Sequence, residues 1–523
     1  MTTVRTHVFV ASLLLALLLG MPFSALFSAV RAQDATPVAA DSGDAPVLLL
    51  AAPGMRPDLV EAFAAEGALP AMASMVDSGE TIDGGLVGPF PATTATSFPT
   101  LLTGTWPGEH GVVGDRFFRT GSPDFADFAN AINPGLIQAD TLPQAVERAG
   151  KTVVAVGWEG LSGLDPALDG PVVGGPVALS RASVVANYDL PERADNGERL
   201  GVDYDRVDPR PAEGWSDAPE SFSPARETDL TLSSLDAEGA NPDREFAVYI
   251  YDSTDDATEN YDHVLVAPEK DAAAAIADLV VGAWASAPLT LAGDLEGQAA
   301  GFWLKAIDLA PDLSRFRLYA TAVSRIDASW AGCMDRPECA APGGFAEAVN
   351  LAVGAPIGVD TASLEAGLID EATFVAQGIT SAWQTVDALR FIVEDLDVQP
   401  DLLLLATPFP EAVSQQFLGL LADRGGDGAV ATPVMSDAEG DGVVAVDDAA
   451  LLGFVRDGYT MADEILAAGR DLLGPEATTL MVSTGGLAPS WRGVNAGQVL
   501  VDAGIAEKAQ LENCVPGAAT APP

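Results

Sequence analysis

The chain has 523 residues, and its 75 acidic against 26 basic side chains give a formal net charge of −49. A hydrophobic content of 48% excludes a chain that is disordered throughout, and the length allows about three domains or one large core with an insertion. So acidic a surface repels phosphate backbones, and lysine occurs only at 151, 270, 305 and 508, so we expect no nucleic-acid partner.

The N-terminus is typical of a secretory signal. Arg5 precedes an apolar run from Val8 to Leu19, which is shorter than the ~20 apolar residues of a membrane span. We therefore expect a signal peptide over 1–32 and a flexible linker over 33–45, with an uncleaved anchor as the alternative. This predicts a secreted or extracytoplasmic protein without a transmembrane span after signal cleavage.

Short apolar runs bounded by turn residues recur along the chain, as in parallel strands that are buried on both faces. The stretch 58–79 has apolar residues at helical spacing and ends at a glycine, so we expect a helix there. Strands that alternate with helices indicate an α/β fold with a doubly wound, mostly parallel sheet and helices on both faces. The predicted strands of this sheet lie at 47–54, 151–158, 400–410 and 478–486.

The middle of the chain has a different pattern, in which apolar and polar residues alternate between acidic turns. We interpret residues 176–345 as a β-rich insertion that divides the core into 46–175 and 346–505. The remaining stretch, 506–523, is too polar and proline-rich to join the core, and we expect a disordered tail.

Two motifs near the first strand resemble the type I phosphodiesterase/nucleotide pyrophosphatase family of the alkaline-phosphatase-like superfamily. They are the GMRPDL turn at 54–59 and the block TLLTGTWPGEHGVVGDRFF at 100–118. The resemblance implies the alkaline-phosphatase-like α/β fold and a threonine nucleophile about ten residues before a Thr-Gly pair. Counting back from Thr103 places Thr94 at the nucleophile position, and Asp115 stands where the family carries a phosphate-contacting asparagine.

In that family, three aspartates and three histidines hold two zinc ions that activate the threonine and stabilise the phosphoryl charge. The matching positions here depart from that set. Pro53 replaces the first aspartate, Glu411 and Gln415 replace an Asp/His pair, and Thr484 and Gly485 replace a second such pair. Glu411 is the only remaining candidate ligand of the zinc site, so we expect the two-zinc site to be absent.

Few histidines are available for such a site. The chain has three, and His7 belongs to the predicted signal peptide. The resemblance implies a structural role for His110, and we interpret His263 as a surface histidine at the start of a strand. Thr94 has a second interpretation as a helix N-cap, and a carboxylate at Asp115 would repel phosphate.

The segment 437–448 matches a calcium-binding loop, with acidic oxygens at positions 1, 3, 5 and 12 and a glycine at position 6. An acidic loop that caps the helix from Ala449 would look similar, so calcium is one of two interpretations. The candidate ligands are Asp437, Glu439, Asp441, the carbonyl of Val443, and Asp448.

Cys333 and Cys339 are close enough in sequence to form a disulfide in an oxidising compartment, which leaves Cys514 unpaired. Taken together, the sequence predicts a secreted pseudoenzyme, a binding or structural relative of the family with impaired catalysis. One alternative is an active metal-dependent phosphodiesterase that uses Thr94. The other is a calcium-stabilised extracellular surface protein. The sequence names no ligand or protein partner.

Overall fold

The computed structural model describes residues 45–82, 85–118, 128–130, 135–161, 164–190, 201–235, 241–333, 336–421, 448–488 and 496–505. The predicted signal peptide, the linker up to residue 44 and the predicted tail 506–523 lie outside these ranges. From Pro46 onward, the described residues belong to one unit, Pro46–Pro523.

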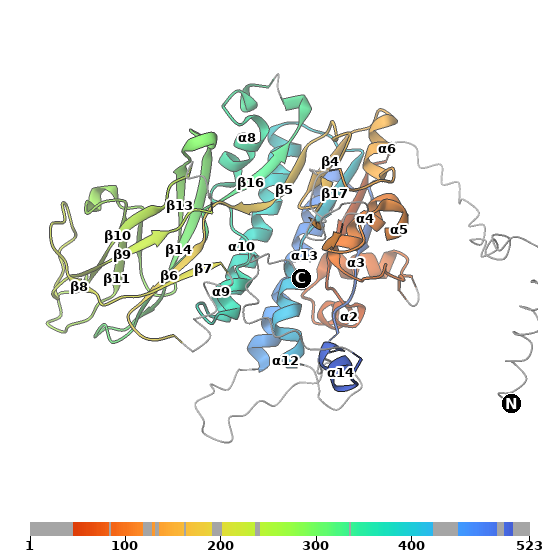
Figure 1. Cartoon of the computed structure of the whole chain (residues 1–523). Helices are drawn as coiled ribbons and strands as arrows, with labels where there is room; N and C mark the ends of the chain where they lie inside the picture. Colours follow the sequence, from red (N-terminus) through yellow and green to blue (C-terminus); the bar gives the residue numbers. More distant parts are fainter. Residues whose placement is uncertain are drawn as a thin grey trace, which may run out of the picture. The chain divides into compact units, whose positions relative to one another are not determined.

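A parallel sheet forms the part of the molecule that carries the family motifs (Figure 1). Its strands follow one another in the order β18, β1, β17, β4 and β5, and each pairs in parallel with its neighbour. Leucine and valine dominate these strands because both faces of a parallel sheet are covered. Their bounds are β1 Val47–Ala51, β4 Val153–Val156, β5 Val172–Ala178, β17 Leu402–Ala406 and β18 Thr478–Val482.

Alternate residues of these strands pack into two separate cores. Leu48, Leu50 and Leu405 face one cluster with the long helices α10 (Glu371–Arg390) and α13 (Asp448–Leu473). Ala51, Val153 and Leu404 face the other, together with Phe98 of α4 (Thr94–Thr103). Because successive side chains of a strand point to opposite faces, the sheet carries helices on both sides.

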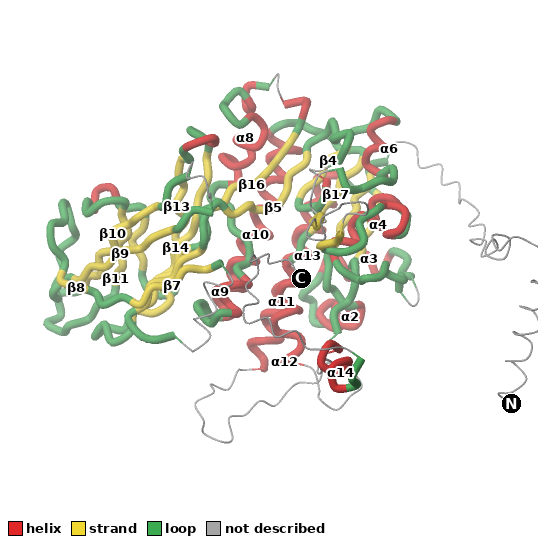
Figure 2. Tube along the Cα trace, viewed as in Figure 1, coloured by secondary structure: helices red, strands yellow, loops and turns green. Residues whose placement is uncertain are grey.

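Beyond β5 the same sheet continues with antiparallel strands, so that eleven strands form one sheet. A second, five-stranded sheet has the order β12, β11, β10, β9 and β8. Apolar residues of both sheets form one core, in which Val248 and Val264 lie with Phe302 and Leu318. The two sheets therefore form a β-sandwich, which Figure 2 shows as the strand-rich part on the left.

The bounds of the sandwich strands complete the architecture. The long sheet adds β6 Ala182–Ala186, β7 Val202–Arg206, β13 Trp284–Thr290, β14 Ala299–Leu309, β15 Phe316–Ala320 and β16 Ser324–Ser329. The second sheet comprises β8 Arg210–Pro211, β9 Arg226–Leu232, β10 Arg244–Tyr251, β11 His263–Ala267 and β12 Ala277–Leu279. The predicted α/β fold with helices on both sheet faces and a β-rich insertion is confirmed.

Two details differ from the expectations. The helix expected over 58–79 is two helices, α2 Pro57–Ala65 and α3 Pro70–Ser78, because Gly67 turns the chain at φ +80° and a proline starts α3. The expected insertion boundary at residue 175 falls within β5, so the insertion continues the core sheet.

Shorter elements and further helices connect these parts. They are β2 Arg116–Phe118, β3 Phe128–Asn130, α5 Pro107–His110, α6 Leu142–Arg148, α8 Gly344–Val353, α9 Thr361–Glu365, α11 Phe409–Val413, α12 Gly419–Leu421 and α14 Ala496–Asp502. Across the described ranges, no single helix is long and apolar enough to cross a membrane, although the bent pair α2 and α3 passes that test together.

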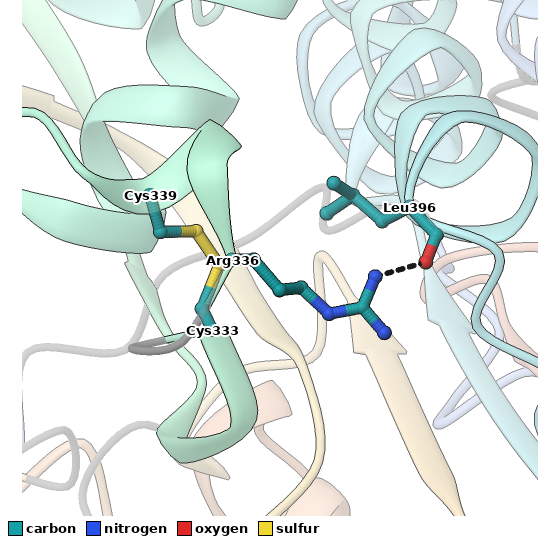
Figure 3. The surroundings of a disulfide bond; sticks show 4 residues. All are labelled: Cys333, Arg336, Cys339 and Leu396. Atoms are coloured by element: carbon teal, nitrogen blue, oxygen red, sulfur yellow. Dashed lines mark hydrogen bonds between the residues drawn. A yellow bond between two sulfur atoms is a disulfide. The ribbon is translucent and has the colours of Figure 1, made fainter.

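Cys333 and Cys339 form a disulfide where the chain leaves β16 and approaches α8 (Figure 3). Both cysteines are buried in the core that contains α10. Between them, Arg336 donates to the carbonyl of Leu396 and lies over the ring of Trp330, at 4.7 Å from its centroid. The bridge thus holds the return from the sandwich against the helical layer.

Candidate functional site

The turns that follow three parallel strands meet at one edge of the sheet. The turn after β1 contains Pro53 and Gly54, the turn after β18 contains 483–486, and Glu411 lies on α11 after β17. The Gly54 amide donates to the Gly485 carbonyl at 3.1 Å, and Gly54 pairs with Gly486 in a parallel bridge. The positions that match the family's metal ligands therefore lie together.

Gly54 makes this convergence possible. Its φ of +78° lies in the left-handed region, and a Cβ there would approach the Glu411 Cα to 2.5 Å. Only glycine accommodates both constraints without a shift of the backbone. The turn after β1 is therefore in close contact with Glu411, the residue that replaces the family's second aspartate.

The Thr94 hydroxyl reaches this edge from the first turn of α4. Its Oγ1 donates a hydrogen bond to Glu411 Oε2 at 2.9 Å. The amide of Gln415, one helical turn along, donates to the other carboxylate oxygen, Oε1, at 3.0 Å. The candidate nucleophile and both replacements at the second metal-ligand pair thus form one direct hydrogen-bonded chain.

Thr94 is not the N-cap of its helix, which corrects that alternative interpretation. Thr93 has the extended backbone of an N-cap residue, and its amide donates to Thr96 Oγ1 at 3.4 Å. Thr94 is the first helical residue, so its side chain is free to point at Glu411. Ser97, one turn later, donates to the Thr484 carbonyl at 3.4 Å and ties α4 to the turn after β18.

Glu159 joins the site without having been expected from the sequence. It follows β4 in the segment GWEG, so it occupies the same kind of strand-end turn as the other positions. Its side chain is exposed, yet the protein surrounds it closely enough that desolvation raises its pKa, and the charges of Glu411 and Asp115 raise the pKa further. The sequence signal that could have indicated Glu159 is its position directly after a predicted strand.

Asp115 lies in the turn before β2 and is exposed. Its charge contributes to the raised pKa of Glu159, so the two carboxylates lie within electrostatic range of each other. Three carboxylates, Asp115, Glu159 and Glu411, are therefore electrostatically connected near Thr94. Negative charge at this density disfavours a phosphate group unless a cation lies between them.

His110 makes its hydrogen bonds away from the Thr94 hydroxyl. It is fully buried, its Nδ1 accepts from the Val112 amide at 3.2 Å, and its Nε2 lies 3.1 Å from Thr100 Oγ1. Desolvation lowers its pKa, so the imidazole stays neutral and structural. His263 begins β11 in the sandwich and pairs with Asp278 at 3.0 Å.

The donor set at the edge does not fit a pair of zinc ions. Zinc prefers imidazole and thiolate with some carboxylates, whereas the positions that match the family's ligands carry a proline, a glutamate, a glutamine, a threonine and a glycine. Throughout the described ranges, no group of three or more His, Cys, Asp or Glu side chains could hold a metal ion. The calcium-loop residues 437–447 lie outside those ranges, and Asp448 begins α13.

Comparison with known proteins gives one family match. The type I phosphodiesterase / nucleotide pyrophosphatase family matches residues 47–283, which include Thr94, Asp115 and Glu159. No curated protein matches the chain.

Two solved structures of phosphonoacetate hydrolase from Sinorhizobium meliloti 1021 are also similar to part of the chain. The complex with phosphonoformate is 23% identical over 21% of this chain, and the complex with phosphonoacetate is 22% identical over 22%. Each likeness spans 26% of the hydrolase chain and has a TM-score of 0.18. Residues 47–283, which include the motifs around Thr94, thus match the type I phosphodiesterase / nucleotide pyrophosphatase family.

Proposed function

We propose that this protein is a catalytically impaired relative of the type I phosphodiesterases, which acts outside the cytoplasm as a binding or structural protein. The observation that carries the proposal is the direct hydrogen bond from Thr94 Oγ1 to Glu411 Oε2 at 2.9 Å. In the family mechanism a metal ion activates the threonine hydroxyl. Here the hydroxyl keeps its proton, which it donates to a carboxylate.

The surroundings of this hydrogen bond support the same proposal. Glu411 Oε1 is already occupied by the Gln415 amide, so both carboxylate oxygens have partners within the protein. Asp115 and Glu159 add negative charge, whereas phosphoryl transfer needs positive charge or hydrogen-bond donors around the phosphoryl oxygens. The site therefore has a threonine at the nucleophile position, but negative charges surround it where phosphoryl transfer needs positive charge.

A hydrolysis assay tests this proposal. The purified mature protein is incubated with aryl phosphodiesters and monoesters, with and without added zinc. We expect the same background rate for wild type, Thr94→Ala and Thr93→Ala. A zinc-dependent rate that Thr94→Ala abolishes and Thr93→Ala preserves would refute impaired catalysis, because Thr93→Ala disturbs the same helix start but leaves the Thr94 hydroxyl.

A cation-dependent hydrolase is the second candidate, and the charge coupling of Glu159 with Glu411 and Asp115 favours it. A divalent cation that prefers oxygen ligands would relieve this repulsion, and because these carboxylates do not form a metal-binding group by themselves, water or substrate oxygens would have to complete its ligands. The same assay with magnesium, manganese or calcium distinguishes it. Activity that Glu159→Gln and Glu411→Gln both remove would support this candidate over the first.

The predicted calcium loop at 437–448 is a separate part of the proposal, because it is remote in sequence from the catalytic positions. Calcium bound there should raise the melting temperature without any effect on hydrolysis. A melting temperature that is equal in calcium and in chelator would refute the proposed calcium site.

A further inference from the structure

A cavity of about 360 Å³ opens between the two sheets of the sandwich. Its lining includes Phe246 of β10 and Phe302 of β14, whose ring centroids lie 5.3 Å apart. Ile276, Leu289 and Pro268 also line it. The volume lies at the lower end of the range of small-molecule sites, which are mostly apolar with a few polar groups.

One cation borders this cavity. Arg244 is the first residue of β10 and lines the cavity. It stands opposite Leu232 of β9, while Phe246 stands opposite Leu230, and both leucines are fully buried in the sandwich core. Because side chains alternate along a strand, Arg244 shares the inward face with Phe246.

The Arg244 guanidinium has no partner among the described residues: none accepts a hydrogen bond from it or forms an ion pair with it. The acid that precedes it, Asp243, accepts instead from the Ser234 amide at 2.8 Å. Glu245 also lines the cavity, but it lies between Arg244 and Phe246 in sequence and therefore belongs to the other face of β10. A half-buried guanidinium of this kind is partly desolvated, which lowers its pKa, although arginine stays charged.

Other arginines of the two sheets have acidic partners. On the same sheet, Arg210 pairs with both Glu227 and Asp229, and in the long sheet Arg317 pairs with Asp308. A desolvated charge without a partner destabilises a protein, whereas a charge-assisted hydrogen bond to an anion offsets that cost. An anionic group at the cavity would thus supply the partner that the described residues do not provide.

We propose that this cavity binds a small organic anion, with an apolar body against Phe246 and Phe302 and a single carboxylate-type head group paired with Arg244. The site lies in the sandwich, away from the Thr94 edge, so it goes beyond the function proposed above and does not depend on it. Among the described residues, the apolar lining would select the body of the ligand, and Arg244 would select the sign of its head group.

Calorimetric titration of the full chain with octanoate tests the proposal, with 1-octanol as the neutral probe of equal chain length. We expect one octanoate per chain, at least tenfold weaker binding of 1-octanol, and at least tenfold weaker octanoate binding for Arg244→Gln. Arg244→Lys, which keeps the charge, should bind within a few-fold of wild type. Arg226→Gln is the matched control, because Arg226 begins the neighbouring strand β9 without lining the cavity.

The proposal is overturned if octanoate does not bind, if it binds no better than 1-octanol, or if Arg244→Gln binds it as tightly as wild type. A second measurement does not depend on the folding of any variant. Phenylglyoxal modifies accessible arginines of the wild-type protein, and mass spectrometry locates the sites. Octanoate should slow modification of Arg244 but not of Arg226, and equal rates at Arg244 with and without octanoate would also overturn the proposal.

Discussion

Two charged side chains in different regions of this molecule have opposite surroundings. At the edge of the parallel sheet, both oxygens of Glu411 accept hydrogen bonds from the chain itself. At the sandwich cavity, Arg244 has no partner in the described part of the chain, although the protein is rich in acids. The difference indicates that the charged group at the candidate catalytic edge is satisfied by internal contacts, whereas the charged group at the sandwich cavity remains available to a ligand.

The two regions also differ in how tightly they pack, and the sandwich is again the more open one. In the helical layer, a Cβ on Gly378 of α10 would lie 1.9 Å from the Phe409 ring. In the sandwich, a cavity of about 360 Å³ remains between the sheets. Substitutions that add one carbon atom or two should therefore have very different effects in the two regions.

The largest effect is expected for Gly378→Ala. The added methyl group overlaps the Phe409 ring, and overpacking of this kind should lower the free energy of unfolding by about 3 kcal/mol. Urea denaturation measures it. Gly453→Ala in α13 is the control, because its Cβ would meet only the end of Arg456 at 3.9 Å, and we expect stabilisation by about 0.5 kcal/mol. Equal effects of the two would contradict the packing difference.

The next effect is expected at the junction of the regions, where the disulfide lies. Replacing both Cys333 and Cys339 by serine should lower the free energy of unfolding by about 2 kcal/mol, the amount for a short closed loop. Wild type treated with a reductant should match the double variant in the same denaturation experiment. A reductant that changes nothing would show that the bridge does not stabilise the junction.

A smaller effect, dependent on pH, is expected at Glu159. Its pKa is raised in the folded protein, so its contribution to stability is complete below the unfolded-state value of about 4.3 and is lost as the pH rises through the folded-state value. Glu159→Gln should therefore stabilise the protein at pH 7, by less than about 1 kcal/mol because the side chain is exposed, and the gain should vanish near pH 4.

Thermal unfolding over this pH range measures the effect at Glu159. Glu61→Gln, on the exposed face of α2, controls for the change in net charge alone. A gain that stays constant from pH 4 to pH 7, or one that Glu61→Gln reproduces, would show that the carboxylates at the edge are not coupled.

The smallest effect is expected for Ala287→Val in the sandwich cavity. Ala287 is buried and lines that cavity, so two extra carbon atoms find space and the free energy of unfolding should change by less than about 1 kcal/mol. Measuring Ala287→Val and Gly378→Ala in the same denaturation experiment compares the packing of the two regions directly. A loss above about 2 kcal/mol would mean that the sheets pack too closely for a ligand.

The sequence predicted the parallel sheet well, because runs such as 402–406 are apolar throughout and bounded by turns. It also singled out Thr94 and Glu411, from their positions relative to a Thr-Gly pair and a strand end, and the structure joins these two side chains by a hydrogen bond. It misplaced the helix cap by one residue, because neighbouring threonines are equally good caps and only the backbone at Thr93 decides.

Other features of the site could not be predicted from local pattern. Glu159 lies outside the motifs at 54–59 and 100–118, and its raised pKa depends on charges that lie far away in sequence. The isolation of Arg244 depends on which acids the fold brings near, because Asp243 is adjacent in sequence yet contacts the Ser234 amide. Tertiary geometry, rather than residue type, decides which charges are paired.

Our central proposal is that the Thr94 edge cannot hold the zinc pair of the type I phosphodiesterases. The most direct test is a crystal of the protein soaked in zinc, with zinc located by anomalous diffraction. We expect no zinc bound to Thr94 Oγ1 and an intact hydrogen bond between Thr94 and Glu411. Two zinc ions within coordination distance of Thr94 and Glu411 would contradict the account and restore the active phosphodiesterase.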